Sequence, residues 1–141
     1  MKARVSWHEV VSFVAESGSG HALVVDGSPE HGGRNLGPRP MELVLMGLGS
    51  CASFDVVTIL KKQRQEIVSC VVELEAARAD AVPAIFTAVE MHFVVTGQGL
   101  DPQKVERAVA LSAEKYCSAS KLFEAAGVAL SHRVTCVESA S

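Results

Sequence analysis

The chain has 141 residues, of which 48% are hydrophobic and 21% charged, and this composition indicates one globular domain and excludes a disordered chain. Its net charge is -3 with acids and bases interspersed, so we expect no nucleic acid partner, because phosphate binding needs a clustered basic surface. The segment that begins at Met1 has no apolar signal-peptide core. We therefore expect a single domain over residues 1–141, located in the cytoplasm.

The first elements along the chain are strands. Residues 3–14 alternate loosely between polar and apolar side chains, residues 17–20 supply a Ser-Gly-Ser-Gly turn, and residues 21–26 form an apolar run. This pattern predicts a β-hairpin. Residues 27–38 are rich in glycine, proline, serine and charge without any periodicity, which predicts a surface loop.

A helix is predicted from Pro40 to about Leu60, with proline at its first position and apolar residues on every face. Such a helix must be buried all round, and a chain of this size offers little material to surround a helix of about 30 Å. We therefore expect a second copy of the chain to cover it. Asp55 leaves an uncharged run of about 12 residues, too short to span a membrane, so no membrane partner is expected.

The remaining elements complete an α+β pattern. Strands are predicted over residues 67–77 and 85–96, which together form an antiparallel hairpin. A helix is predicted to start at Pro102, a short helix to run over about 119–126, and a last strand to cover 128–137.

Four cysteines in a cytoplasmic chain are expected to be free thiols. Cys51 lies in the middle of the first helix among small residues, and this pattern alone favours a buried structural cysteine over a reactive thiol. Cys117 lies between two predicted helices, and Ser118 or Ser120 can cap the second. A helix N-terminus favours the thiolate form, so Cys117 is a candidate reactive thiol, with simple packing as the alternative.

Other chemistries lack their motifs. Cys70 and Cys136 occur on apolar faces of predicted strands and are expected in the core. The five histidines are scattered without the paired spacing of a zinc site, so no metal is expected. Neither a serine-hydrolase elbow nor a phosphate-binding loop occurs in the sequence.

One longer pattern is specific. The segment from Pro40 to Cys51, followed 66 residues after Cys51 by the sequence around Cys117, resembles the OsmC/Ohr family and most closely its YhfA-like branch. The order of elements agrees along nearly the whole chain. This resemblance implies an OsmC-like fold, with antiparallel sheets around a central buried helix, in an intertwined homodimer.

The resemblance also implies thiol peroxidase chemistry without a cofactor. Cys51 would attack the O–O bond of a small peroxide, preferentially an organic one, and become a sulfenic acid. Cys117 would then condense with it to a disulfide, which an external dithiol reductant would reduce.

The sequence departs from the peroxidases of this family in its activating groups. Their arginine on the first hairpin is missing from residues 16–21, and Met41 stands where their glutamate follows the helix-opening proline. Glu42 comes one position later, and at about 100° per residue it projects from the side of the helix opposite Cys51. Arg39 is the preferred candidate for a replacement cation. Without such a cation we expect slow peroxide reduction.

Two further functions fit the same residues. In the first, an apolar dimer cleft holds a small hydrophobic ligand while the cysteines sense oxidation. In the second, the chain forms a structural dimer with inert buried thiols. The reactivity of Cys51 toward alkylation distinguishes the peroxidase from the structural dimer.

Overall fold

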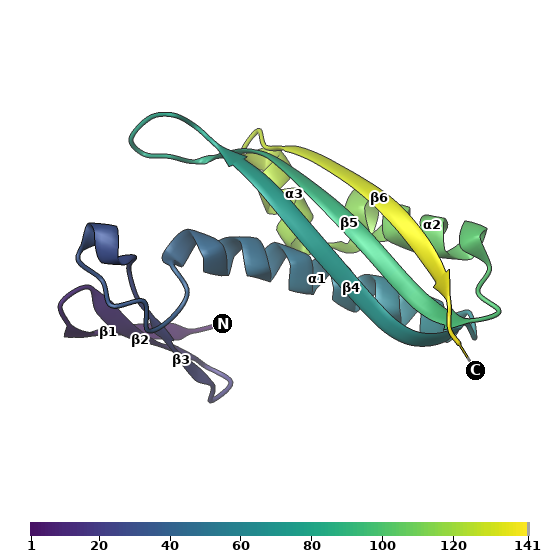
Figure 1. The fold of residues 1–141 in the computed structure, drawn as a ribbon, viewed down its shortest axis with the longest axis horizontal. Coiled ribbons are helices and arrows are strands. Elements are labelled where there is room, and N and C mark those ends of the chain that lie inside the picture. Colours follow the sequence, from purple (N-terminus) through teal and green to yellow (C-terminus); the bar gives the residue numbers. More distant parts are fainter. Residues whose placement is uncertain (141) are drawn as a thin grey trace. The chain divides into compact units, whose positions relative to one another are not determined.

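The computed structural model describes residues 1–140 and confirms the α+β class (Figure 1). The chain forms two compact units, the first covering residues 1–46 and the second beginning at residue 47. The first contains β1 to β3, and the second contains β4 to β6 with α2 and α3. Helix α1, Pro40–Lys62, begins in the first unit and continues into the second.

The first unit is an antiparallel sheet of three strands, where the sequence predicts two. The strands are β1 (Ala3–Glu9), β2 (Ser12–Ser17) and β3 (Ala22–Val25), in the order β1-β2-β3. The additional turn lies at Val10, whose φ is 54°. Because a β-branched residue rarely adopts this left-handed conformation, the sequence around Val10 carries no turn signal. The predicted single hairpin is therefore corrected to a three-stranded meander.

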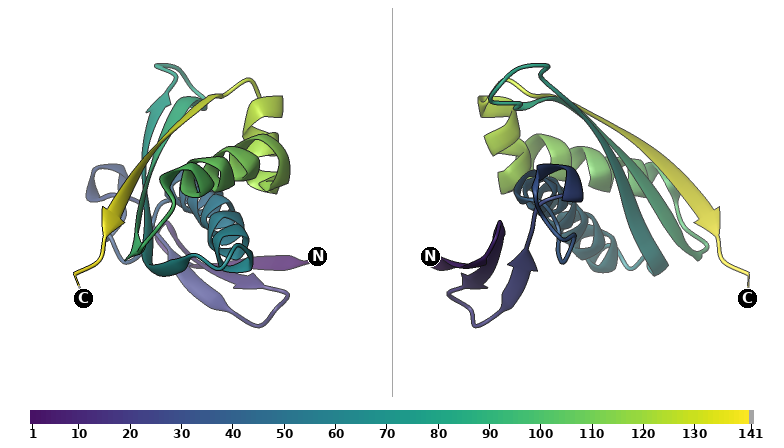
Figure 2. Two further views of the ribbon diagram at one scale, coloured as in Figure 1. Left: turned by 90° about the vertical axis from the view of Figure 1, so that its right-hand side faces the viewer. Right: turned by 60° about the vertical axis from the view of Figure 1, so that its left-hand side comes forward.

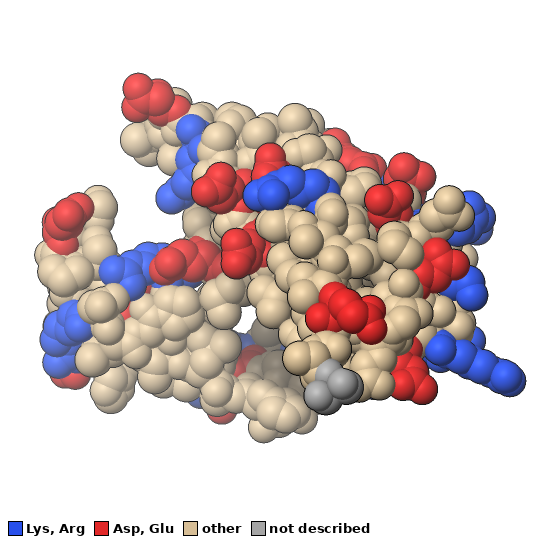
Figure 3. Space-filling model, turned by 45° about the vertical axis from the view of Figure 1, so that its right-hand side comes forward, with Lys and Arg blue, Asp and Glu red and all other residues tan. Residues whose placement is uncertain are grey.

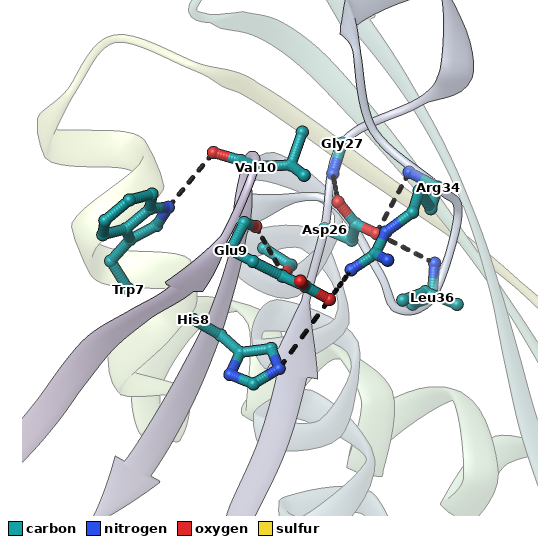
Figure 4. A network of polar contacts seen from close by, with 9 residues as sticks. Trp7, His8, Glu9, Val10, Asp26, Gly27, Arg34 and Leu36 are labelled. Atoms are coloured by element: carbon teal, nitrogen blue, oxygen red, sulfur yellow. Dashed lines mark hydrogen bonds and ion pairs between the residues drawn. The ribbon is translucent and has the colours of Figure 1, made fainter.

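A buried carboxylate organises the loop after β3 (Figure 4). The side chain of Asp26 accepts backbone hydrogen bonds from Gly27 at 2.7 Å and from Arg34 and Leu36 at 3.2 Å each. Burial opposes ionisation of this carboxyl, but the three N–H donors prevail and lower its pKa below the ordinary value. The Arg34 guanidinium also pairs with Glu9 at the end of β1. Hydrogen bonds and an ion pair thus hold the predicted loop, residues 27–38, against the sheet that precedes it.

Within one chain, α1 is buried along one stripe only. Leu48, Ala52, Val56 and Leu60, spaced four residues apart, are buried, whereas Phe54 is 73% exposed. Of the helices in residues 1–140, α1 alone is long and apolar enough to cross a membrane by length and composition, a test that the core helix of a soluble protein also passes. The all-round burial predicted from the sequence is not reached within one chain, and the homodimer that would complete it stays a prediction.

The second unit is built on a mixed sheet. Strands β4 (Glu66–Arg78) and β5 (Phe86–Gln98) form the predicted antiparallel hairpin. Strand β6 (Ala129–Glu138) joins β5 in parallel, so the sheet is not antiparallel throughout. The reason is the connection through α2 and α3, since a parallel neighbour needs a long crossover between the strands.

Helices cover one face of this sheet (Figure 2). Figure 2 shows α2 (Pro102–Leu111) and the part of α1 after residue 46 on the same side of the sheet. Met91, Phe93 and Val95 of β5 are buried on this face. A π-helical turn, Ser112–Tyr116, follows α2 directly and leads to α3, Ser118–Ala125. On the face of the molecule drawn in Figure 3, basic and acidic side chains are interspersed among uncharged ones.

Candidate active site

Cys51 lies in the middle of α1 and is half-buried. The small residues around it suggest a close approach of another backbone, and at Gly49 the structure shows one. A Cβ atom added to Gly49 would lie 2.7 Å from Cδ1 of Leu74 and 3.4 Å from Cγ1 of Val72, both on β4. Glycine therefore allows α1 to approach the sheet closely, and this approach fixes the position of the helix that carries Cys51.

Cys117 lies at the predicted helix junction and is fully buried. It follows the π-helical turn and is itself the N-cap residue of α3, with extended backbone angles. Its sulfur accepts the backbone N–H of Ser120 at 3.3 Å. The capping atom is thus the thiol, where the sequence suggested the hydroxyl of Ser118 or Ser120.

Ser112 joins the two cysteine-bearing segments. Its hydroxyl donates to the carbonyl oxygen of Ala52, the residue after Cys51, at 3.0 Å, and Oδ2 of Asp55 lies 3.3 Å away. Its carbonyl oxygen accepts the backbone N–H of Cys117 at 2.9 Å. Because Cys117 is five residues after Ser112, this bond belongs to the π-helical turn, and such turns are frequent at functional sites.

The structure brings the two predicted reactive thiols together. Cys51 and Cys117 lie close enough for the Cys51 thiol to influence the ionisation of Cys117. Burial raises the pKa of the Cys117 thiol, and the adjacent Cys51 thiol raises it further, while the N–H and hydroxyl groups of Ser120 act in the opposite direction. Both thiols are free in this structure.

Cys70 and Cys136 lie elsewhere, on the two outer strands of the second sheet. Both are in register with Val95 of β5, which stands between them. Two strand spacings place their Cα atoms about 10 Å apart, beyond the limit of about 7 Å for a disulfide. They occupy the face that carries the buried residues of β5, although each is only partly buried. Cys70 and Cys136 therefore lie on the core-facing side of the sheet, as expected, but neither side chain is fully buried there.

The other two predicted site residues, Arg39 and Glu42, pair with each other at the start of α1. The Glu42 carboxylate accepts the backbone N–H of Arg39 at 2.9 Å, and its Oε1 lies 3.7 Å from the Arg39 Nε. A glutamate that reaches back from the third helical position in this way caps the helix. Glu42 thus has a structural role, and the activation of Cys51 by Arg39 stays a prediction.

A groove of about 530 Å³ is lined by residues of α1, α2 and the π-helical turn, and neither Cys51 nor Cys117 is among its lining residues. Asp55 stands one helical turn after Cys51, and Tyr116 directly precedes Cys117. Its lining combines apolar side chains with one acidic residue, Asp55, and one basic residue, Lys62. The lining residues are Asp55, Thr58, Ile59, Lys62, Gln63, Leu111 and Tyr116.

Sequence reasoning missed the roles of two serines in this site. The periodicity of the second helix places Ser112 on the apolar face, where it reads as a small core residue. Ser120 was considered as a cap, whereas the structure places it beside the Cys117 sulfur. Within residues 1–140, no group of three or more histidine, cysteine, aspartate or glutamate side chains is arranged to hold a metal ion.

Comparisons with known proteins agree with this architecture. The family model described as "OsmC-like protein" matches residues 31–133. Protein YhfA of Escherichia coli strain K12 is 47% identical over 126 residues, covering 89% of this chain and 91% of YhfA. A solved structure from structural genomics is 44% identical, with a TM-score of 0.89 over 99% of this chain and 100% of the other. An organic hydroperoxide resistance protein OsmC from Legionella pneumophila has a TM-score of 0.71 at 20% identity over 95% of both chains.

Proposed function

Because this chain belongs to the family of OsmC-like proteins, we propose that it is a thiol-dependent reductase of organic hydroperoxides that uses Cys51 and Cys117. The observation that carries the proposal is the proximity of these two thiols, which come from segments 66 residues apart in the sequence and of which Cys51 influences the ionisation of Cys117. The L. pneumophila protein with the same fold is described as an organic hydroperoxide resistance protein, which favours the same chemistry here.

The reaction assigns a different role to each sulfur. The Cys51 thiolate attacks the distal oxygen of the hydroperoxide, the O–O bond breaks, and the alcohol leaves while Cys51 becomes a sulfenic acid. The Cys117 sulfur then attacks the Cys51 sulfur and water leaves, which gives the disulfide. An external dithiol supplies two electrons and returns both thiols. Cys51 is the peroxide-reactive sulfur because it is half-buried, whereas Cys117 is fully buried.

The groove whose lining includes Tyr116, the residue before Cys117, supports an organic rather than an inorganic peroxide as substrate. Ile59, Leu111 and Tyr116 provide apolar surface for a hydrocarbon chain. Lys62 stands at the same groove and can pair with an anionic group at the far end of a substrate. The groove also favours the second candidate function, a hydrophobic ligand-binding protein whose thiols sense oxidation.

Peroxide consumption with dithiothreitol or dihydrolipoamide as reductant tests the proposal. Cys51→Ser should abolish turnover, and Cys117→Ser treated with peroxide in the absence of reductant should stop at a Cys51 sulfenic acid detectable by mass spectrometry. Cys70→Ser is the matched control and should retain turnover, because Cys70 is separated from the pair. Rapid alkylation of Cys51 without turnover would favour the redox-sensing protein, and inertness to alkylation would favour the structural dimer.

The proposed cation is tested separately. If Arg39 assists Cys51, Arg39→Ala should slow alkylation of Cys51 at neutral pH in a Cys117→Ser background. Glu42→Gln is the control, because it removes the carboxylate partner of Arg39 and leaves the guanidinium in place. An unchanged alkylation rate in Arg39→Ala would show that Arg39 only holds the start of the helix.

A further inference from the structure

The two sulfurs of the site differ in access. Cys117 has no exposed surface, whereas Cys51 is half-buried. Reduction of a disulfide requires a thiolate to approach one sulfur in line with the S–S bond, and access decides which sulfur is attacked. In a disulfide between these residues, the surroundings of Cys117 block its approach side, so the open sulfur is that of Cys51.

The groups around Cys117 can also stabilise a thiolate that leaves the disulfide at this position. Its sulfur accepts the Ser120 backbone N–H at 3.3 Å at the beginning of α3. The Ser120 hydroxyl is completely buried and has no hydrogen-bond partner within residues 1–140. An unpaired buried hydroxyl is costly, and the Cys117 sulfur is the acceptor within its reach. A negative charge on that sulfur would satisfy both Ser120 donors.

The balance of influences on Cys117 changes when Cys51 is modified. Burial is the largest cause of the raised pKa of Cys117, and the hydrogen bond and charge of Cys51 add to it. Both contributions of Cys51 require its free thiol, so they vanish once Cys51 carries a reductant. The two contributions of Ser120 then remain, and they favour the thiolate.

We propose that the reductant attacks the disulfide at Cys51, that Cys117 departs as the thiolate, and that Ser120 is the positioning residue that receives this thiolate. The inference deepens the proposed function and rests on the Cys51–Cys117 disulfide that it contains. It specifies where the dithiol becomes covalently attached.

The external dithiol reduces the Cys51–Cys117 disulfide in two exchange steps. A thiolate of the external dithiol attacks the Cys51 sulfur, a new S–S bond forms, and the bond to Cys117 breaks with its electron pair moving to Cys117. The second thiol of the reductant then attacks its own sulfur in the mixed disulfide, and Cys51 departs as thiolate. The reductant leaves as a disulfide, having lost two electrons, and solvent protonates the two cysteines.

The experiment uses a disulfide formed without peroxide. The full chain carrying Cys70→Ser and Cys136→Ser is oxidised with diamide, exposed briefly to glutathione at neutral pH, quenched with acid, unfolded and alkylated with N-ethylmaleimide. Peptide mass spectrometry locates the two adducts. We expect glutathione on Cys51 and maleimide on Cys117, in large excess over the converse arrangement.

Ser120→Ala should slow this first exchange about ten- to a hundredfold, which is the effect of losing one hydrogen bond to a charged group. Ser118→Ala is the matched control, because Ser118 is the exposed first residue of α3, and it should leave the rate unchanged. A Ser120→Ala protein that forms the disulfide normally but releases Cys117 slowly separates this role from a merely structural one.

Three outcomes would overturn the inference. Glutathione found mainly on Cys117, or an unchanged rate in Ser120→Ala, would refute it and leave the peroxidase proposal standing. Failure of diamide to join Cys51 to Cys117 would refute it together with the disulfide step of the proposed function. Because diamide replaces the peroxide, a lack of peroxide turnover alone does not affect the result.

Discussion

Replacement of Ser112 by alanine tests how the fold holds the two thiols in contact. The Ser112 hydroxyl is fully buried and donates to the Ala52 carbonyl at 3.0 Å, with Oδ2 of Asp55 at 3.3 Å. Alanine removes this bond without leaving an unpaired donor, and it creates little empty space. We therefore expect the free energy of unfolding to fall by about 1 kcal/mol, and by about 2 kcal/mol if the carboxylate contributes.

The same substitution should weaken the disulfide. Ser112 is bonded both to the residue after Cys51 and to the backbone of Cys117, so its hydroxyl helps to hold one sulfur against the other. A loss of one or two kcal/mol corresponds to a factor of about 5 to 30 in an equilibrium constant. We expect the equilibrium between the Cys51–Cys117 disulfide and glutathione to shift toward the dithiol by a factor in this range.

Two assays check this prediction. Urea denaturation of the reduced proteins measures the change in stability, and mass spectrometry across a series of glutathione redox buffers measures the change in the disulfide equilibrium. Ser53→Ala is the control on the same helix, because the bonds from Ser112 to α1 go to Ala52 and Asp55 and not to Ser53. If Ser112→Ala and Ser53→Ala behaved alike in both assays, the bond from Ser112 to α1 would have no part in pairing the thiols.

The other predictions concern assembly, packing and pH. Since Phe54 is 73% exposed on an apolar helix, we expect an obligate dimer in light scattering that Phe54→Arg disrupts; a stable native-like monomer of the parent chain would contradict this. Gly49→Ala should lower the free energy of unfolding, measured by urea denaturation, by about 1–3 kcal/mol, because its Cβ would lie 2.7 Å from Leu74 Cδ1. An unchanged free energy of unfolding would mean that the Leu74 side chain on β4 moves aside without cost. Burial raises the pKa of the Cys117 thiol in the folded state, so the unfolded thiol ionises first. The stability of the reduced protein should be fully present below about pH 8.5 and decline as pH rises toward the folded value. Equal pH dependence in Cys117→Ser would refute this.

Elements that depend on local sequence were predictable. The long apolar run after Pro40 gave α1, and the alternation on either side of the connection at residues 79–85 gave β4 and β5. The Asp101-Pro102 pair gave the start of α2, where the Asp101 side chain accepts the Gln103 N–H at 3.0 Å. In each case the signal lies within a few residues of the feature that it specifies.

Elements that depend on distant contacts or on an unusual backbone conformation could not be predicted from the sequence. Val10 adopts a left-handed backbone conformation that valine disfavours, so the local sequence does not predict a turn there. The parallel pairing of β6 with β5 follows from the crossover through α2 and α3, because the strand pattern of β6 would suit either direction.

The candidate site combines both kinds of information. Motif similarity identified Cys51 and Cys117, but their contact depends on a π-helical turn, which inserts one residue into the helical ladder and which helical periodicity does not predict. That turn ends with the N–H of Cys117 on the carbonyl of Ser112, and the Ser112 hydroxyl then reaches α1. A regular helix at this point would rotate the following residues by about 100° and direct the thiol elsewhere. The irregularity is therefore the feature that makes two distant cysteines a pair, and a substitution that restores regular α-helix at Ser112 should separate them even if both thiols are retained.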